Sequence, residues 1–380
     1  MQLSYYLHDL HYEIGHANVT LNSIEFIDGV ENYDIKFVVF SHAKAKSLFN
    51  KDINVTIHKV PFGDMKPTLL KIVWFQIYTF FYAYIFDRNR TKISLGVANL
   101  ACDISIIHFI HAQWHEKYFD LLKPNGIKKF YKKVLFTYLD LCELYLFKIK
   151  KTKVITVSNF LKDFFIEENN YKHEDVVAIH SGFDLSRFKT TGKSQEELKV
   201  ILARENTEIE SLDLARPIFL FVGAFERKGL GILLNQWKSH NSNSQLIVIG
   251  MPEGTNKFNL KNTIHIEKTK LINEFYEISD SFVFPTHYEP FGMVLIEAAV
   301  KGLDIHTTKR MVGASEIIEG LDSIEIFEDI NTFKLPNTLN KLRSNERDER
   351  SRHRITSLKK YNWLNCAKEY KKVLNKWSNN

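Results

Sequence analysis

The chain is poor in cysteine, proline and glycine. Its 380 residues include 3 Cys, 8 Pro and 16 Gly. The cysteines, Cys102, Cys142 and Cys366, form no Cys-x-x-Cys pair, which excludes a disulfide-rich scaffold and favours a reducing compartment. The low proline and glycine content argues against fibrous and linker-rich architectures. The opening residues, MQLSYYLHDLHYE, have neither a basic nor a long apolar segment, so we expect no secretory signal.

The composition is that of a folded protein with sizeable cores. Hydrophobic residues make up 44% of the chain and charged residues 25%. With 29 Phe and 16 Tyr, the chain carries more apolar surface than a disordered protein keeps in water. Its length is sufficient for two domains, each with a core of its own.

Positive charge is concentrated in one stretch of the first half. Residues 51–160 contain 17 Lys and Arg against 8 Asp and Glu, whereas the rest of the chain contains 34 against 37. The formal net charge of +6 therefore originates in this stretch. Such an asymmetry indicates a surface that meets an anionic partner, either lipid or nucleic acid.

Short apolar runs alternate with helical patterns from end to end. The runs are nearly continuous, as expected of strands that are buried on both faces of a parallel sheet. They lie at residues 34–41, 105–110, 154–158, 176–180, 217–223, 245–250 and 281–285. Helices between parallel strands place the chain in the α/β class.

Two polar regions predict the domain boundaries. Residues 185–216 are polar and charged, so we expect a linker there, between an N-terminal domain at 1–184 and a C-terminal domain at 217–360. In residues 361–380, apolar side chains recur at helical spacing, which predicts a terminal amphipathic helix. These side chains are Trp363, Ala367, Tyr370 and Val373.

Residues 280–302, DSFVFPTHYEPFGMVLIEAAVKG, are the most informative stretch. A strand ends at Pro285, a loop follows, and a helix begins near Phe291. The first backbone N–H groups of a helix have no partner within it, and they lie at the positive end of the helix dipole, so they suit a phosphate group. Here they belong to Gly292, Met293 and Val294.

Two glutamates belong to the same stretch. Glu289 lies in the predicted loop and Glu297 within the predicted helix. A carboxylate accepts hydrogen bonds from hydroxyl groups, and for Glu297 these could be the two hydroxyls of a ribose. Taken alone, the pair also fits a helix-capping glutamate and a surface glutamate.

Two adjacent cations follow another predicted strand. Arg227 and Lys228 come four and five residues after Gly223, at the carboxyl end of the strand, where α/β proteins bind their ligands. Arginine binds phosphate through two parallel hydrogen bonds and lysine adds a point charge, so the pair suits a diphosphate. A solvated turn is the alternative interpretation.

The order of these features resembles the donor-site motif of retaining GT-B glycosyltransferases, specifically glycosyltransferase family four. The motif consists of a strand, Glu-Pro-Phe-Gly, and a helix with a second glutamate. Further segments resemble elements of the family in the same order, from about residue 100 to the end. They are residues 154–165 (VITVSNFLKDFF), 176–188 (VVAIHSGFDLSRF), 217–230 (PIFLFVGAFERKGL), 313–318 (GASEII) and 361–370 (YNWLNCAKEY). One departure is that Arg227 and Lys228 are adjacent, in a shortened loop that resembles that of lipopolysaccharide-core glucosyltransferases.

The resemblance implies a GT-B fold, with two Rossmann-like domains whose parallel sheets face each other across a cleft and a terminal helix that crosses back to the N-terminal domain. It implies transfer of a hexosyl group, with retention at the anomeric carbon, from a nucleotide-sugar to a hydroxyl of a cell-surface glycan or lipid-linked acceptor. A UDP-sugar is the favoured donor. The sequence contains no Asp-x-Asp, so we expect neither a metal nor a cofactor.

The resemblance also implies roles for single residues. Lys228 and Arg227 stabilise the leaving phosphate, Glu289 positions the sugar, and Glu297 holds the ribose. No carboxylate stands out as a covalent nucleophile, so the implied mechanism is attack from the same face, with the leaving phosphate helping to deprotonate the acceptor.

Three more positions enter the predicted site less directly. His111 follows the apolar run at 105–110, where the family has an active-site histidine near the donor sugar; a structural histidine is the alternative. Gly15 could open a helix against the diphosphate or the acceptor, but a plain turn glycine fits as well. The segment at Ile266 resembles the loop with which the family contacts the nucleotide base.

The histidines around His111 also invite a zinc site. His108 and His115 lie three residues before and four residues after it. We expect a strand and a loop here, which would not place the three on one helical face, and no His-Glu-x-x-His pattern follows. The sequence therefore predicts no metal at this position.

Two segments suggest a membrane surface. Residues 69–86 are mostly apolar and aromatic, and we expect a core or membrane-facing helix there and not a spanning one. Residues 128–153 combine an apolar stripe with eight lysines at its ends, which fits either an interfacial helix on anionic lipid or a core helix with basic ends. The stripe consists of Leu135, Tyr138, Leu139, Cys142, Leu146 and Ile149. We expect a cytoplasmic protein, peripheral on the inner face of the cytoplasmic membrane, with no nucleic acid partner.

Two other functions remain open. A different GT-B enzyme, such as a nucleotide-sugar epimerase or a phosphorylase, would share the donor site without needing an acceptor glycan. A catalytically silent, membrane-associated interaction module would bind lipid but no nucleotide. An NAD enzyme is disfavoured, because Gly223, Gly229 and Gly231 do not form Gly-x-Gly-x-x-Gly.

Overall fold

The computed structural model describes residues 1–12, 14–43, 48–51, 53–188, 190–223, 226–240, 243–250, 260–337 and 339–378. The chain divides into two units, one of Met1–Phe183 with Tyr361–Asn380 and the other of Asp184–Lys360. Residues 224 and 225 of the 217–230 motif, residue 189 of the expected linker and the last two residues of the expected terminal helix lie outside this description.

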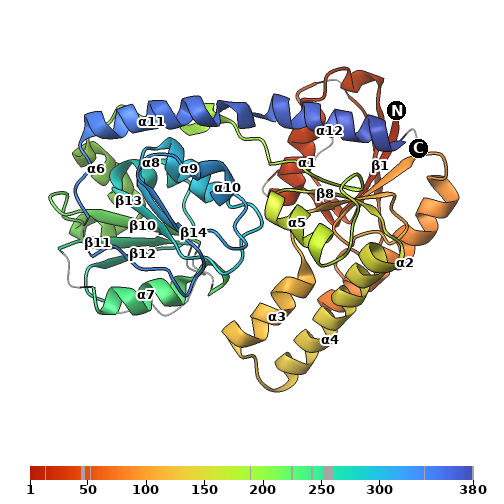
Figure 1. Cartoon of the computed structure of the whole chain (residues 1–380), viewed down its shortest axis with the longest axis horizontal. Coiled ribbons are helices and arrows are strands. Elements are labelled where there is room, and N and C mark those ends of the chain that lie inside the picture. Colours follow the sequence, from red (N-terminus) through yellow and green to blue (C-terminus); the bar gives the residue numbers. More distant parts are fainter. Residues whose placement is uncertain are drawn as a thin grey trace. The chain divides into compact units, whose positions relative to one another are not determined.

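The first unit is built on a sheet of parallel strands (Figure 1). In spatial order, the described strands are β5 (Asn54–Lys59), β3 (Asp34–Val39), β1 (Gln2–Tyr6), β6 (Thr91–Leu95), β7 (Ile104–Ile107), β8 (Lys153–Thr156) and β9 (Val176–Ala178). A short parallel pair, β2 (Asp9–Leu10) with β4 (Ser41–His42), continues the chain beyond β1 and β3. The helices are α1 (Gly15–Glu25), η1 (Val30–Asn32), α2 (Thr68–Phe86), α3 (His111–Leu122), α4 (Gly126–Glu143), the π-helix η3 (Leu144–Ile149), α5 (Asn159–Glu167) and α12 (Trp363–Ser378).

The pleat of this sheet divides its core into two layers. Tyr5 and Leu7 pack with α1 and α12 on one face, whereas Tyr6 packs on the other face with Phe75 of α2. Side chains that alternate along a strand point to opposite faces, so a strand covered on both sides must be apolar throughout. This explains the continuous apolar runs of the sequence.

The second unit contains another parallel sheet, in the order β12 (Thr263–Ile266), β11 (Gln245–Ile249), β10 (Ile218–Val222), β13 (Ser281–Phe284), β14 (Asp304–Thr308) and β15 (Ile324–Phe327). Its helices are η4 (Leu185–Phe188), α6 (Gln195–Glu205), η5 (Thr207–Ser211), η6 (Glu226–Lys228), α7 (Leu230–Lys238), α8 (Ile272–Ile278), α9 (Met293–Val300), α10 (Ser315–Ile318), α11 (Ser344–Leu358) and, at the boundary between the units, η7 (Lys359–Tyr361). The predicted α/β class is confirmed by both sheets.

In both sheets, the order in which successive strands are added reverses at one point. In each, the first three long strands in chain order run outward on one side of the first strand and the later strands lie on its other side, which is the Rossmann arrangement. The switch points fall between β1 and β6 in the first unit and between β10 and β13 in the second. The loops that leave the carboxyl ends of these strands are the positions at which such sheets bind ligands.

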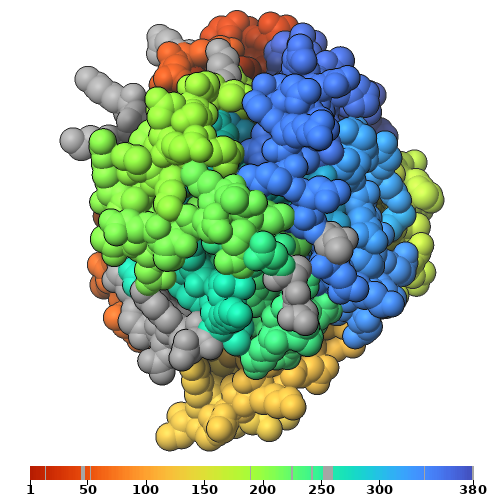
Figure 2. Space-filling view, turned by 90° about the vertical axis from the view of Figure 1, so that its left-hand side faces the viewer, coloured from red at the N-terminus to blue at the C-terminus, as the bar shows by residue number. Residues whose placement is uncertain are grey.

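The segment at 185–216, which we expected to be a linker, is part of the second unit. Ser194 and Glu197 form a capping box that starts α6, and Leu198 and Leu202 of this helix are buried. Figure 2 shows this segment, in yellow-green, spread over one face of the second unit near α11, in blue. The polar composition reflects a surface helix with one buried edge.

The terminal helix α12 belongs to the first unit. It packs along α1, and Ala367, Tyr370 and Val373 are buried in the core layer that also contains Tyr5. Trp363 lies at the start of the helix against Gly182, where a Cβ atom would come within 2.7 Å of the Trp363 backbone. The close approach leaves room only for glycine at this position.

The apolar stripe that we considered for lipid contact is mostly core. Leu135, Leu139, Cys142 and Leu146 are buried, and among the stripe's residues only Ile149 is well exposed, at 66%. The opposite edge of α4 carries a different set of exposed apolar side chains. They are Ile127, Phe130, Val134 and Leu141, followed by Leu144 and Tyr145 of η3.

Candidate functional site

The loop after β10 places Lys228 in the second unit. Gly223 follows the strand with a φ of +99°, a conformation that favours glycine, and a Cβ there would lie 2.5 Å from Cδ of Lys228. The lysine side chain therefore lies across the glycine. Its Nζ is 5.6 Å from the centre of the Phe284 ring. Burial lowers the pKa of Lys228, and the carboxylate of Glu289 partly offsets the effect.

Arg227 connects this loop to the loop after β13. Its guanidinium donates to the backbone oxygen of Tyr288 and, at 3.1 Å, to Oε2 of Glu289. The same oxygen of Glu289 lies 3.9 Å from Nζ of Lys228. One carboxylate thus lies against both cations.

The loop of Glu289 is fixed by backbone contacts. Glu289 forms a parallel bridge with Val312, and its N–H donates to the oxygen of Met311 at 2.9 Å. Phe291 is buried, and its carbonyl accepts from the Ala314 amide at 2.6 Å. These contacts hold the loop that leads to the start of α9.

The start of α9 offers the amides that the sequence predicted. Gly292 caps the helix with a φ of +98°, and the N–H groups of Gly292, Met293 and Val294 donate to no residue that the structure describes. Met293 and Val294 are only partly buried. A phosphate group could therefore accept from these amides at the positive end of the helix dipole.

Glu297 lies on α9, one turn inside the helix. The hydroxyl of Tyr276 donates to its Oε2 at 2.9 Å, and Lys228 interacts with it electrostatically. Burial raises the pKa of the Glu297 carboxyl, although Tyr276 and Lys228 work in the opposite direction. Tyr276 has no motif of its own, and the sequence analysis missed it.

Ile266 ends β12 at the same edge of the sheet. Its side chain is buried, and its carbonyl accepts from the Gly250 amide at 3.0 Å. The predicted donor residues of the second unit thus follow the carboxyl ends of β10 and β13, which flank the switch point, and of β12 at the edge of the sheet. Their individual roles remain predictions.

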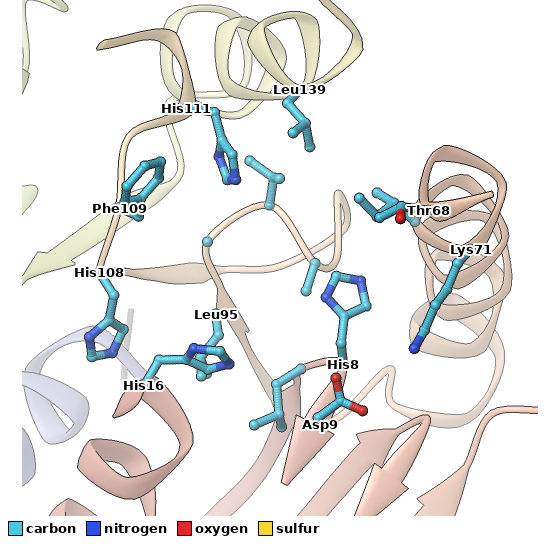
Figure 3. Close-up of a pocket in the computed structure, with 15 residues that line it drawn as sticks. His8, Asp9, His16, Thr68, Lys71, Leu95, His108, Phe109, His111 and Leu139 are labelled. Carbon is cyan, nitrogen blue, oxygen red and sulfur yellow. The ribbon is translucent and has the colours of Figure 1, made fainter. Parts of the chain in front are cut away.

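A cavity of about 360 Å³ opens at the corresponding edge of the first unit (Figure 3). It lies at the switch point between β1 and β6, and four histidines line it together with Asp9 and Lys71. The histidines are His8, His16, His108 and His111. Figure 3 shows these side chains converging from several strands and helices.

His111 is held by a carboxylate that the sequence analysis did not single out. It is the first residue of α3, and Glu143 of α4 accepts from its amide at 2.7 Å and lies 2.9 Å from its Nδ1. The second oxygen of Glu143 accepts from the Ala112 amide at 3.0 Å. The carboxylate caps α3 and leaves Nε2 of His111 for other partners. The one sign of Glu143 in the sequence was its place as an acidic residue among the apolar side chains of the stripe at 135–149.

The expectation that a loop separates the neighbouring histidines is wrong for two of them. His111 and His115 lie four residues apart on α3, and therefore on one face of that helix. Each faces a carboxylate of α4, Glu143 and Asp140 respectively. Among the residues that the structure describes, no group of three or more possible metal ligands is found.

Two of the cavity's histidines are neutral at physiological pH. Burial lowers the pKa of His8 to about 4 and that of His108 to about 3. The Nε2 atoms of both are buried without a hydrogen-bond partner among the described residues. Neutral imidazoles of this kind suit hydroxyl groups, which both donate and accept hydrogen bonds.

Gly15 is the first residue of α1. A Cβ there would meet no atom within 4 Å, so the protein itself does not require glycine at this position. Its predicted contact with a ligand stays a prediction.

The two Rossmann-like units define the class of protein. The chain has the GT-B glycosyltransferase fold, as superposition on solved structures shows. The lipopolysaccharide glycosyltransferase WaaG matches with a TM-score of 0.63 at 14% identity, covering 99% of this chain and 96% of that one. HepE from Anabaena, solved with UDP and glucose, gives 0.62 at 13% identity, with coverage of 99% and 100%. Sucrose-phosphate synthase from Thermosynechococcus elongatus gives 0.64 at 14%, with 99% and 98%.

A family model matches part of the second unit. Residues 203–360, less than half of the chain, are similar to the family described as glycosyl transferases group 1. This confirms the resemblance stated from the motifs.

Among curated proteins, the capsular polysaccharide biosynthesis glycosyltransferase CapM of Staphylococcus aureus is 26% identical over 186 residues, 44% of this chain and 46% of that protein. A probable sucrose-phosphate synthase of Thermosipho melanesiensis is 32% identical over 116 residues, 29% of this chain and 25% of that protein. The chain thus matches about half the length of one curated relative and a quarter of the other.

The buried histidines predict a pH-dependent stability. A histidine in the unfolded chain has a pKa of about 6.5 and is protonated below that pH. In the folded protein, His108 stays neutral down to about pH 3, so the unfolded state binds one proton more in this range. Stability is therefore present above pH 6.5 and is lost as the pH falls. Between pH 7 and pH 5, His108 should lower the free energy of unfolding by about 2 kcal/mol. Urea denaturation of His108→Gln should show a correspondingly smaller loss.

The exposed His353 of α11 provides the control, since its side chain is 68% exposed. His353→Gln should lose as much stability between the two pH values as the wild type. An identical pH dependence in His108→Gln and wild type would contradict a neutral, buried His108.

Proposed function

We propose that this protein is a retaining glycosyltransferase that moves a hexosyl group from a nucleoside-diphosphate sugar, with a UDP-sugar favoured, to a hydroxyl of a cell-surface glycan or lipid-linked acceptor. The observation that carries the proposal is the donor constellation of the second unit. Arg227, Lys228, the amides at the start of α9 and the pair Glu289 and Glu297 belong to one edge of the sheet in a group 1 domain.

Charge stabilisation of the leaving group is supplied by Lys228 and Arg227. Both cations lie against Glu289, and Cγ of this glutamate lies 3.1 Å from the position of a Cβ at Gly292, which caps α9. As the bond to the sugar breaks, negative charge grows on the diphosphate, and these groups are already oriented to receive it. They supply the positive charge that a metal supplies in other transferases, so no metal and no cofactor is required.

The glutamates act on hydroxyl groups. Glu297 has one oxygen bonded to Tyr276, and its other oxygen is available to a ribose diol. Glu289 positions the sugar, while the leaving phosphate helps to deprotonate the acceptor on the same face. The HepE structures with UDP and glucose and with UDP-glucose support a nucleotide-sugar as the donor class.

The acceptor belongs to the cavity of the first unit. Its polar lining includes the neutral His8 and His108 together with Asp9 and Lys71, which suits the hydroxyls of a sugar better than a strongly anionic group. His111, oriented by Glu143, assists at the donor sugar.

Lys228 provides the first test. We expect Lys228→Ala to abolish micromolar binding of one nucleoside diphosphate and to lower turnover about 10²–10³-fold, because the leaving group loses about 2–4 kcal/mol of stabilisation. Calorimetric titration with UDP, GDP, ADP and CMP, with and without added magnesium, measures the binding.

Lys238→Ala, an exposed lysine at the end of α7, is the matched control and should bind as the wild type does. If no diphosphate binds the wild type, the donor site is not functional and the interaction module takes precedence. Product analysis with and without acceptor separates a transferase from an epimerase or a phosphorylase.

The two glutamates should differ in their effects. Glu297→Gln replaces one oxygen that can accept from the ribose hydroxyls by an NH2 group that cannot, and it should weaken diphosphate binding about tenfold or more. Glu289→Gln leaves the two cations unbalanced, so diphosphate binding should persist while turnover falls about 10²-fold. Steady-state kinetics and calorimetry on both variants distinguish kcat from binding. Near-wild-type kinetics in both would refute these roles.

We also propose that the first unit contacts an anionic membrane, peripherally and on the cytoplasmic face. Helix α2 is long and apolar enough to span a bilayer by composition, and 22% of the relevant window is buried. Its middle is nevertheless held against the loop that follows β6, since Gln76 donates to the Val97 oxygen at 2.6 Å and the Asn99 side chain donates to the backbone oxygen of Thr79 at 2.9 Å. A helix anchored laterally in this way fits a surface better than a span.

The exposed face of α2 provides the apolar part of this surface. Leu70, Ile77, Phe81 and Tyr84 follow one another at helical spacing and are each at least half exposed. Helix α4 packs beside α2 through Tyr131, whose hydroxyl accepts from the Leu69 amide, and it adds exposed lysines. Apolar side chains with flanking lysines are typical of interfacial helices on anionic lipid.

The double variant Ile77→Ser, Phe81→Ser tests this contact. These side chains are 50% and 60% exposed, so the fold should tolerate the change, while vesicle binding should weaken tenfold or more, since each apolar side chain contributes about 1.5–3 kcal/mol when buried. Sedimentation with lipid vesicles measures the binding. Val200→Ser, at an exposed apolar residue of the second unit, should have no effect; unchanged binding in the double variant would contradict the proposal.

A further inference from the structure

A second cavity of the first unit lies at the edge of the sheet opposite to the histidines. It has a volume of about 560 Å³ and is bounded by the residues that lead into β6, β7 and β8 and by the end of α12. These are the amino ends of the strands, whereas His8 and His108 follow the carboxyl ends of β1 and β7. The cavity is therefore separate from the acceptor site.

The lining of this cavity is strongly basic. Six cations line it against a single carboxylate, that of Asp103. Two of them are paired: Arg90 lies 2.5 Å from Asp34, and Lys92 lies 2.9 Å from Asp103. The other four have no carboxylate partner among the residues that the structure describes. They are Arg88, Lys150, Lys151 and Lys153.

The unpaired cations are held in place by neutral groups. Lys153 lies 5.7 Å from the centre of the Trp377 ring, and Lys151 donates to the Asn169 oxygen at 2.6 Å. Lys150 donates to the backbone oxygens of Leu100 and Cys102. Positive charge is thus concentrated at fixed positions without the acids that would neutralise it.

An unsatisfied hydroxyl lines the same cavity. Thr152 is only 4% exposed, and its Oγ1 has no hydrogen-bond partner among the described residues. Buried hydroxyls are nearly always hydrogen-bonded, so this one indicates a ligand that completes the set. Burial also lowers the pKa of Lys150, an effect that a bound anion would reverse.

Exposed apolar side chains adjoin the cavity. Ile85 and Phe86, the last two residues of α2, come shortly before Arg88 and are 58% and 64% exposed. Ile149, which directly precedes Lys150, is 66% exposed. A small soluble phosphate compound has no apolar part that would pack against these side chains. A phospholipid offers both parts, since its headgroup is anionic and its glycerol and acyl chains are apolar.

We propose that this cavity binds the phosphate of an anionic phospholipid headgroup, with Arg88 and Lys153 as its cationic partners and the Thr152 hydroxyl as a donor. The inference rests on the membrane contact proposed above and adds a specific headgroup site to it. It gives the membrane contact a preference for anionic lipid that the apolar face of α2 alone would not have.

The test compares vesicles of phosphatidylcholine with vesicles that also contain phosphatidylglycerol. The double variant Arg88→Ala, Lys153→Ala should bind the anionic vesicles about 25-fold more weakly, at about fivefold for each cation, and should bind neutral vesicles unchanged. Thr152→Val, which keeps both charge and shape, should also lower the preference for anionic vesicles. The control, Lys172→Ala with Lys368→Ala, removes the same charge from exposed positions that do not line the cavity and should change little.

The possible failures are distinguishable. Equal binding of anionic vesicles by the double variant and the control would overturn the headgroup site, while the membrane contact would stand. A wild type that binds vesicles without preferring anionic ones would overturn the headgroup site and leave only the apolar part of the membrane contact. A wild type that binds no vesicles would refute both. Competition by micromolar inorganic phosphate or glycerol phosphate would overturn the lipid assignment in favour of a soluble ligand. Nucleotide titration of each variant reports separately on the donor site.

Discussion

The contact of one carboxylate with two cations organises the proposed donor site. Glu289 lies against Arg227 and Lys228, and these three residues come from the two loops that flank the switch point of the second sheet. Without the acid, two partly buried cations would face each other unbalanced; without the cations, the acid would be buried alone. Each loop is therefore held in place by the charge on the other. Because Lys228 folds across Gly223, neither the glycine nor the backbone direction at the end of β10 can change without moving the charge.

The fold could be predicted from the sequence because its strands are buried on both faces. The runs ending at Val222, Ile249 and Phe284 are nearly continuous in apolar residues, as a parallel sheet covered by helices on both sides requires. Strands such as β14 (DIHTT) and β5 (NVTIHK) carry polar residues and give no such signal. The segment at 185–216 misled for a related reason, since a surface helix buries only one edge and is otherwise as polar as a linker.

The candidate site was predictable where its geometry is local. Gly292, Met293 and Val294 are consecutive, and a helix start exposes their amides whatever surrounds it. Tyr276 and Glu143 were missed because their partners, Glu297 and His111, lie 21 and 32 residues away in the chain. Only the packing of α8 on α9 and of α3 on α4 brings these pairs together, and a single sequence contains no record of that packing. Which side of α4 is exposed also depends on this packing, and the sequence does not record it.

Glu143 also links two parts of the first unit. The helix that carries it, α4, presents its apolar outer edge and its lysines to the surroundings, while the carboxylate at its end holds both the first amides of α3 and the ring of His111. A displacement of α4 along its axis would therefore pull on the imidazole. The orientation of a side chain in the cavity thus depends on the position of a helix whose other edge is exposed.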